Sequence, residues 1–143
     1  MKFMVLVKAT AESEAGQMPD ASLMRAMTAY NEELMKAGVL LAGEGLQPTK
    51  RGARVRFEGD RRSVIDGPFA ETRELVAGYW IFEAGSLQEC IDWVKRCPNP
   101  HNEDSEIEIR QIFAPEDFAD IAPDVFAREE AMRVELEARQ KKG

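Results

Sequence analysis

The sequence predicts an α+β domain with an antiparallel sheet and two helices packed on one face. Segments of strand length, either apolar throughout or alternating, are interspersed with two longer segments of helical periodicity over residues 3–113. Glycines, prolines and a helix-capping sequence separate these segments. With 143 residues, of which 44% are hydrophobic and 31% charged, the chain has the size and composition of one globular domain.

The first part of the chain predicts a strand, a helix and a second strand. Residues 3–8 form a short apolar run typical of a buried strand, and a polar loop is expected over residues 11–18. A helix should run from the N-cap Asp20 to Ala37. Its apolar face recurs at helical spacing: Leu23, Met24, Met27, Tyr30 and Leu34. Residues 39–46 indicate a strand that two glycines open to close approach.

The second part predicts a hairpin, a strand, a helix and a last strand. Residues 54–57 and 62–65 flank a Gly59-Asp60 turn, and residues 75–83 are rich in aromatic and branched side chains. Ser86-Leu87-Gln88-Glu89 is a capping box that opens the second helix. The apolar stripe expected on that helix consists of Leu87, Cys90, Ile91 and Val94. Residues 106–113 alternate again, as a half-buried strand does.

In order, these elements give a ferredoxin-like βαββαβ plan with an added hairpin over residues 1–113. The second face of the sheet either stays polar or meets another copy, and the aromatic side chains of residues 75–83 favour a homodimer. Residues 114–143 form a charged extension with a helix from about Pro123. We expect this extension to lie on the partner subunit or to fray.

Charge and cysteine usage exclude several classes of protein. A net charge of −7 argues against a nucleic-acid binder, and the basic residues near positions 50–62 are better explained as a solvated hairpin face. Cys90 and Cys97 would lie about 10 Å apart on one helix, too far for a disulfide. We therefore expect a cytoplasmic protein with no membrane segment, signal peptide, metal or cofactor. The single histidine, His101, is assigned to a polar loop rather than to a site.

The segment Asp66-Gly67-Pro68-Phe69, with residues 70–74 after it, predicts a rigid and shaped loop between two strands. Gly67 and Pro68 restrict the backbone, and the Asp66 carboxylate can accept hydrogen bonds from nearby N–H groups. Phe69 is a large apolar residue in a polar loop, so it should insert into a core or a pocket.

Residues 66–74 resemble the Asp-Gly-Pro-Phe motif of the YCII-related (DGPF-domain) family, and residues 42–46 and 77–80 resemble further stretches of it. The resemblance covers about residues 1–113. It implies a ferredoxin-like fold that dimerises through its sheets into an α+β barrel, and a small pocket between sheet and helices. It also implies an acid–base role for Asp66 and a genomic link to extracytoplasmic-function sigma factors. Relatives often have histidine where this chain has Gln47, which cannot exchange protons at neutral pH.

Three functions remain open at this point. The motif can be structural, or the chain can bind a small organic molecule, alone or as a regulatory dimer linked to such a sigma factor. It can also be a cofactor-independent isomerase, lyase or dehydrochlorinase. In the catalytic case Asp66 is the general acid or base, beside the carboxylates of Glu44 or Glu71. Arg73 then holds an anion, Gln47 and Tyr79 orient the substrate, and Phe69 contacts it.

Overall fold

The computed structural model describes residues 1–142, and of Arg73 it describes the backbone alone. The chain divides into two compact units, Met1–Gln111 and Ile112–Gly143. Unit one contains a four-stranded main sheet and a separate two-stranded sheet. Among the described residues, no helix combines the length and apolar character that crossing a membrane requires.

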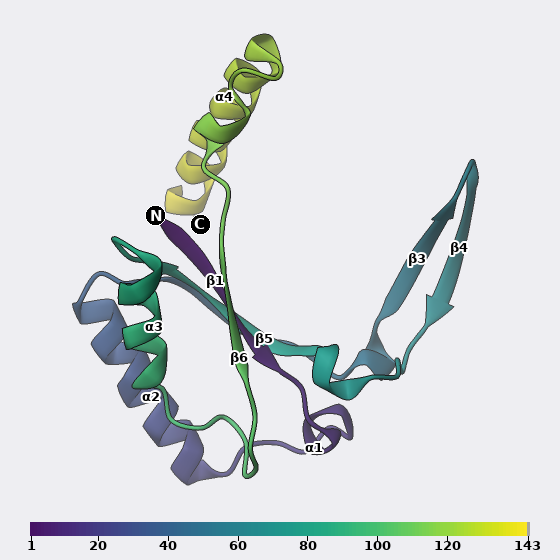
Figure 1. Cartoon of the computed structure of the whole chain (residues 1–143), viewed down its shortest axis with the longest axis vertical. Helices are drawn as coiled ribbons and strands as arrows, with labels where there is room; N and C mark the ends of the chain where they lie inside the picture. Colours follow the sequence, from purple (N-terminus) through teal and green to yellow (C-terminus); the bar gives the residue numbers. More distant parts are fainter. Residues whose placement is uncertain (143) are drawn as a thin grey trace. The chain divides into compact units, whose positions relative to one another are not determined.

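The main sheet has the strand order β2, β5, β1, β6, and every neighbouring pair is antiparallel. Its strands are β1 (Lys2–Lys8), β2 (Leu40–Gly45), β5 (Val76–Glu83) and β6 (Ile107–Gln111). Helix α2 (Ala21–Lys36) joins β1 to β2, and α3 (Leu87–Lys95) joins β5 to β6. This arrangement confirms the α+β, ferredoxin-like prediction, and Figure 1 shows both helices on the same side of the sheet.

Strands β3 (Ala53–Glu58) and β4 (Arg61–Asp66) form the inserted hairpin, which we call the arm (residues 53–66). The predicted turn is present, since Gly59 has a φ of 55°, a conformation that glycine adopts readily. The arm pairs only with itself and extends away from the main sheet (Figure 1).

Helix α2 begins and ends where the sequence predicted. The Asp20 carboxylate accepts a hydrogen bond of 2.8 Å from the Leu23 N–H, and Gly38 follows the helix with a φ of 73°. The predicted face was too wide, however. Tyr30 and Leu34 are buried, whereas Met24 is 57% exposed because it lies outside the stripe that faces the sheet.

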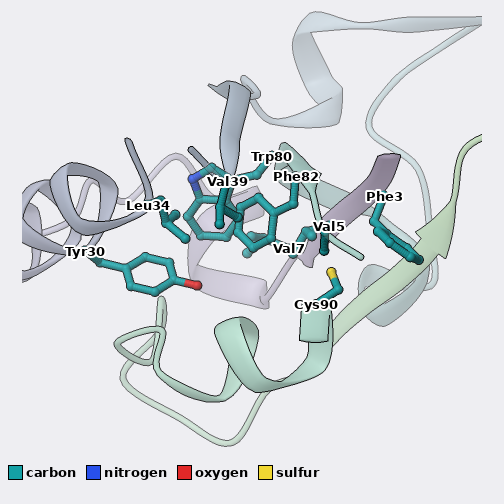
Figure 2. Packing of buried hydrophobic residues seen from close by; sticks show 10 residues of the cluster. Phe3, Val5, Val7, Tyr30, Leu34, Val39, Trp80, Phe82 and Cys90 are labelled. Carbon is teal, nitrogen blue, oxygen red and sulfur yellow. The ribbon is translucent and has the colours of Figure 1, made fainter. Parts of the chain in front are cut away.

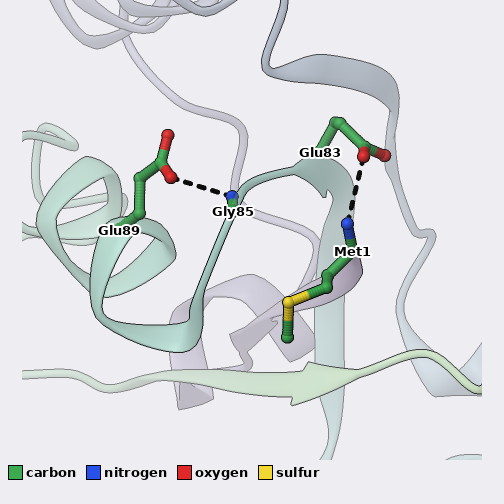
Figure 3. A network of polar contacts seen from close by, with 4 residues as sticks. All are labelled: Met1, Glu83, Gly85 and Glu89. Carbon is green, nitrogen blue, oxygen red and sulfur yellow. Dashed lines mark hydrogen bonds and ion pairs between the residues drawn. The ribbon is translucent and has the colours of Figure 1, made fainter.

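Helix α3 differs from its prediction in two details. The Ser86 hydroxyl accepts from the Glu89 N–H (3.1 Å), but the Glu89 carboxylate accepts from the Gly85 N–H (2.8 Å), one residue beyond the capping-box position. Figure 3 shows this contact beside the ion pair between the amino group of Met1 and Glu83. Leu87 was expected in the buried stripe, yet it is 49% exposed because it occupies the first turn of the helix.

The core lies between the sheet and the two helices (Figure 2). Its largest buried side chains are Phe3, Val5, Leu34, Phe82 and Cys90. Tyr30 packs edge-on against Trp80 with ring centroids 5.9 Å apart, and its hydroxyl donates to the Trp93 carbonyl over 2.7 Å. The hydroxyl thus joins α2 to α3 while its ring stays in the core. Burying each large apolar side chain contributes roughly 1.5–3 kcal/mol.

Helices α2 and α3 both lie on one face of the main sheet, and the other face carries neither of them (Figure 1). Strand alternation places Met4, Leu6, Tyr79 and Ile81 there, and all four are half-buried. Trp80 and Phe82 point to the helix side and are used by the core of the same chain. Most of the aromatic content that suggested a partner therefore serves the monomer, and the second face is aliphatic with one tyrosine.

Further helical segments lie outside the α2 and α3 pair. Residues 11–18 were expected to be loop throughout, but Ala11–Glu14 form a short helix, α1, capped by reciprocal hydrogen bonds between Thr10 and Ser13. In unit two, the 3₁₀ turn η3 (Pro115–Phe118) precedes α4 (Pro123–Lys142), which begins at the predicted residue.

Candidate functional site

Unit one contains a cleft of about 930 Å³ at one end of the main sheet. Segments around α1, the start of α2, β2, β5 and the loop after α3 all contribute to its lining. Its apolar residues include Val7, Leu23, Met27, Leu40 and Trp80. Its polar residues include Asn31, Gln47, Lys50, Arg51 and His101. Three carboxylates, those of Glu12, Asp20 and Glu44, line it too. The cleft therefore combines an apolar wall with hydrogen-bonding groups and with charged groups of both signs.

A hydrogen bond holds the Trp80 indole in the apolar wall, and the lack of a side chain at Gly43 leaves room for it. Its Nε1–H donates to Asn31 Oδ1 over 3.0 Å. A Cβ atom at Gly43 would lie 2.8 Å from the indole Cδ1, so only glycine leaves the ring its place. The open backbone that the sequence indicated at Gly43 is occupied by this ring.

Three polar lining residues come from one connection. Gln47 follows β2, and Lys50 and Arg51 lie in the 3₁₀ turn η1 (Thr49–Arg51). Among the described side chains, neither Lys50 nor Arg51 has an ion-pair partner within 4.0 Å. Two cationic groups are thus available to a ligand at this wall.

His101 enters the cleft from the loop after α3. Its Nε2 lies 2.8 Å from the Lys8 carbonyl oxygen, and its backbone N–H donates to Asn99 Oδ1 over 3.0 Å. Because a carbonyl oxygen only accepts, Nε2 carries the hydrogen, and the neutral ring has its lone pair on Nδ1. Sequence reasoning missed this residue; its being the only histidine was the one available signal.

The loop of residues 66–74, which we call the motif loop, contacts η1 through glycine and a backbone amide. A Cβ atom at Gly67 would lie 1.7 Å from the Thr49 carbonyl oxygen, so no other residue fits without movement. The Gly67 N–H donates to the Gly52 carbonyl over 3.1 Å. The Phe69 N–H donates to Thr49 Oγ1 over 3.0 Å. The Gly67–Pro68 peptide is cis.

Thr49 connects the motif loop to α1 as well. Its hydroxyl donates to Glu14 Oε2 over 2.5 Å, and its N–H donates to Glu14 Oε1 over 3.2 Å. One threonine therefore receives a hydrogen bond from Phe69 and gives two to Glu14, immediately before Lys50 and Arg51. The motif loop acts on the cleft by holding the turn that carries its cations.

The residues predicted for the site divide into two groups. Glu44, Gln47 and Tyr79 line the cleft. The structure brings Asp66, Phe69 and Glu71 to the motif loop instead, and they are absent from the lining of the cleft. The proposed anion-binding role of Arg73 concerns a side chain that lies outside the described residues.

The motif-loop side chains have the following surroundings. Asp66 ends β4 as an exposed residue, and among the described groups its carboxylate makes none of the loop hydrogen bonds expected of it. Phe69 is half-buried, with the Arg54 guanidinium 3.9 Å from its ring centroid. Glu71 is exposed and has a φ of 59°, the left-handed region that non-glycine residues seldom adopt.

Burial disfavours the thiolate form of both cysteines. Both are free thiols, and burial raises the pKa of Cys90 and of Cys97 to about 11. Nearly all of each thiol is protonated at neutral pH, so the reactive thiolate is scarce. Within residues 1–142, no cluster of three or more His, Cys, Asp or Glu side chains is placed to hold a metal ion.

Comparisons with known proteins agree with the resemblance at the motif. The family model of the YCII-related domain matches residues 1–116. An uncharacterised protein of Rhizobium meliloti (strain 1021) is 31% identical over 93 residues, which cover 65% of this chain and 75% of that protein. Among solved structures, 5-chloro-2-hydroxyhydroquinone dehydrochlorinase (TftG) from Burkholderia phenoliruptrix AC1100, in complex with 2,5-dihydroxybenzoquinone, is 18% identical. The match has a TM-score of 0.44 and covers 82% of this chain and 98% of that one.

Proposed function

The chain belongs to the YCII-related family, and we propose that it binds a small organic molecule with a ring and an acidic group in the cleft. The single observation that carries this proposal is the composition of the cleft. An apolar wall around Trp80 lies in the same cavity as Lys50 and Arg51. Cavities of 300–1,000 Å³ with a mostly apolar lining and a few placed polar groups are typical of small-molecule sites.

The wall residues suggest which part of the ligand goes where. Trp80 and Met27 offer a flat ring and a polarizable thioether, which suit an aromatic or alicyclic body. Lys50 and Arg51 suit a carboxylate or phenolate, and Gln47 can donate or accept beside them. The motif loop supports this binding at a distance, through Thr49.

Ring carboxylates are the first probes to use, with 4-hydroxybenzoate as the reference and phenol and cyclohexanecarboxylate for comparison. Tryptophan emission should change saturably, because Trp80 is one of only two tryptophans and lines the cleft. The double variant Lys50→Ala/Arg51→Ala should weaken binding of the carboxylates by about tenfold or more, a loss of at least ~1.4 kcal/mol.

The control removes the same charge elsewhere. Arg61→Ala/Arg62→Ala alters the exposed tip of the arm and should leave the dissociation constant within about twofold. Equal losses in the two double variants would show that only net charge matters and would contradict the cleft proposal. A panel of ring carboxylates that gives no saturable change would contradict it too.

The acid–base alternative is favoured by one observation, which concerns His101 rather than Asp66. Its Nε2–H is held by Lys8, so Nδ1 keeps the lone pair in a ring that lines the cleft. Such a nitrogen can take a proton from an acidic carbon and return it. Wild type, with cleft-binding keto acids in D₂O, should exchange their α-hydrogen for deuterium, whereas His101→Gln should bind but not exchange. Loss of exchange in His101→Gln, together with equal exchange in Asp66→Asn and wild type, would assign the role to His101, whereas undiminished exchange in His101→Gln would contradict it.

We further propose that the protein is a cytoplasmic homodimer whose subunits meet at the open face of the main sheet. Met4 lies opposite Ile81, and Leu6 lies opposite Tyr79, so four half-buried apolar side chains are contiguous there. The two free cysteines suit a reducing compartment. Light scattering should give twice the chain mass of 16.1 kDa, and Leu6→Arg should reduce it to that of one chain.

A further inference from the structure

The arm is a two-stranded sheet that unit one leaves uncovered. All of its residues, from Ala53 to Asp66, are exposed, and neither strand pairs with the main sheet. Isolated two-stranded hairpins are marginally stable in water because they bury little apolar surface. The arm nevertheless contains four large apolar side chains, which are exposed as follows: Val55 52%, Phe57 69%, Val64 67% and Ile65 43%.

Strand register sorts these side chains onto two different faces. Val55 pairs with Val64, and Phe57 pairs with Arg62, whose guanidinium lies 4.5 Å from the Phe57 ring centroid. Side chains of directly paired residues share a face, and alternation puts both pairs on the same one. We call this the apolar face of the arm.

The opposite face of the arm is basic. Its members are Arg54, Arg56, Glu58, Arg61, Ser63 and Ile65. Arg56 forms an ion pair with Glu58 on this face, and Arg54 lies over Phe69 at the base of the arm. The arm is thus amphipathic across its thickness. An alternation of this kind is typical of a sheet with one face buried and the other in water.

The distribution of charge along the chain indicates what covers the apolar face of the arm. Residues 50–66 contain six of the 19 basic residues of the chain but only three of its 26 acidic residues. The rest of the chain is therefore strongly acidic, and a second copy offers the arm a surface of opposite charge. Such complementarity steers association at long range, and the apolar face, whose one basic side chain is Arg62, supplies the buried contact.

We propose that the arm docks on a second copy of this chain, with its apolar face against the partner, so that each subunit reaches across to the other. This inference rests on the homodimer proposed above and deepens it, because it adds an exchanged arm to the contact at the open sheet face. A mutual contact of this kind is isologous and closes at two subunits.

The test detects the arm of one copy on the other. A nitroxide at Ser63→Cys, in a Cys97→Ser background, is placed on the basic face, away from the docking surface. The nitroxide-labelled protein contains no ¹⁵N, and it is mixed with ¹⁵N-labelled protein that carries no nitroxide. Amide signals of the ¹⁵N copy should broaden at a defined surface. A nitroxide at exposed Thr28→Cys on α2 is the control and should broaden different signals or none.

Each outcome supports or overturns the arm contact, the sheet-face homodimer, or both. A dimeric mass with broadening on the ¹⁵N copy supports the arm contact. A dimeric mass with no broadening overturns the arm contact and leaves the sheet-face dimer standing. A monomeric mass overturns both. A second sample carries the nitroxide and the ¹⁵N on the same chain. Broadening confined to residues 112–142 in that sample would show that the arm is covered by its own unit two, and this result would also overturn the proposal.

A pair of variants supplies a second readout. Val64→Lys places a charge on the apolar face, and Ser63→Lys places the same charge one residue away on the basic face. The first should raise the dimer dissociation constant about tenfold or more, whereas the second should change it by less than about threefold. Equal effects would contradict docking through the apolar face.

Discussion

Strand β1 and the arm show how differently one chain treats the same alternating pattern. In β1, Phe3, Val5 and Val7 are at most 8% exposed, because α2 and α3 cover their face of the sheet. In the arm, Val55 and Val64 are at least 52% exposed, although they are paired as regularly as any residues of the main sheet. Regular pairing therefore does not require burial within the subunit.

This contrast shows which interactions stabilise unit one. Backbone pairing contributes little net free energy by itself, and the burial of apolar side chains decides whether a sheet is stable. The main sheet obtains this burial from its own helices. The arm obtains none from them, so we attribute its sequence to a contact outside the subunit.

The largest expected difference comes from truncating one apolar side chain in each region. Leu34→Ala removes a fully buried side chain from α2 and should lower the free energy of unfolding by roughly 2–5 kcal/mol. Val64→Ala in the arm should cost less than about 0.5 kcal/mol in dilute monomer, since its side chain is in water. Urea unfolding at two protein concentrations measures both. A large Val64→Ala effect that is independent of concentration would break the comparison.

A smaller effect is expected where the arm meets the body. Gly67→Ala should lower the free energy of unfolding by roughly 2 kcal/mol, since its new Cβ would lie 1.7 Å from the Thr49 carbonyl oxygen. It should also weaken carboxylate binding, because Lys50 and Arg51 follow Thr49. Gly52→Ala is the matched control, with its nearest atom at 3.6 Å and a φ of −123°. Similar costs at the two positions would show that the close approach does not matter.

The smallest expected effect is on how the free energy of unfolding depends on pH, to which the core contributes and the arm does not. Burial raises the pKa of Cys97 to about 11 from an ordinary value of 9.0, so the native state holds a proton that the unfolded state loses first. This stabilisation is complete below about pH 9 and is lost as the pH rises toward 11. Between pH 9 and 10.5, Cys97→Ser should reduce the loss of stability by about 1 kcal/mol.

The arm has no cysteine or tyrosine and cannot contribute to this titration. Arg61→Ala/Arg62→Ala should therefore leave the alkaline slope unchanged. Urea unfolding at closely spaced pH values provides the measurement. An identical slope in wild type and Cys97→Ser would rule out the thiol as its source.

The sequence predicted those parts of the fold that depend on local chemistry. The Asp20 cap, the Gly38 stop and the Gly59 turn each follow from one residue type in one backbone conformation. The width of a buried helical face does not follow from any single residue type. Met24 and Leu87 are as apolar as their buried neighbours, and only the position of the sheet decides that both are exposed.

The site was harder to predict because its contacts are distant in sequence. The approach of Gly67 to Thr49 spans 18 positions, and the contact of His101 with Lys8 spans 93. No periodicity or spacing encodes either contact. Sequence reasoning therefore selected Asp66 by its place in a distinctive motif. Of the predicted residues, Glu44, Gln47 and Tyr79 line the cleft, and His101 lies there in addition.

The bond from Phe69 to Thr49 has an evolutionary consequence. The motif fixes where the turn lies, but Lys50 and Arg51 face the cleft without touching the motif loop through any described hydrogen bond. Substitutions at those two positions are free to change what the cleft accepts while the motif stays intact. Because the motif loop holds the turn and not the two cationic side chains, we expect proteins that share the motif to differ in the ligand that their clefts accept.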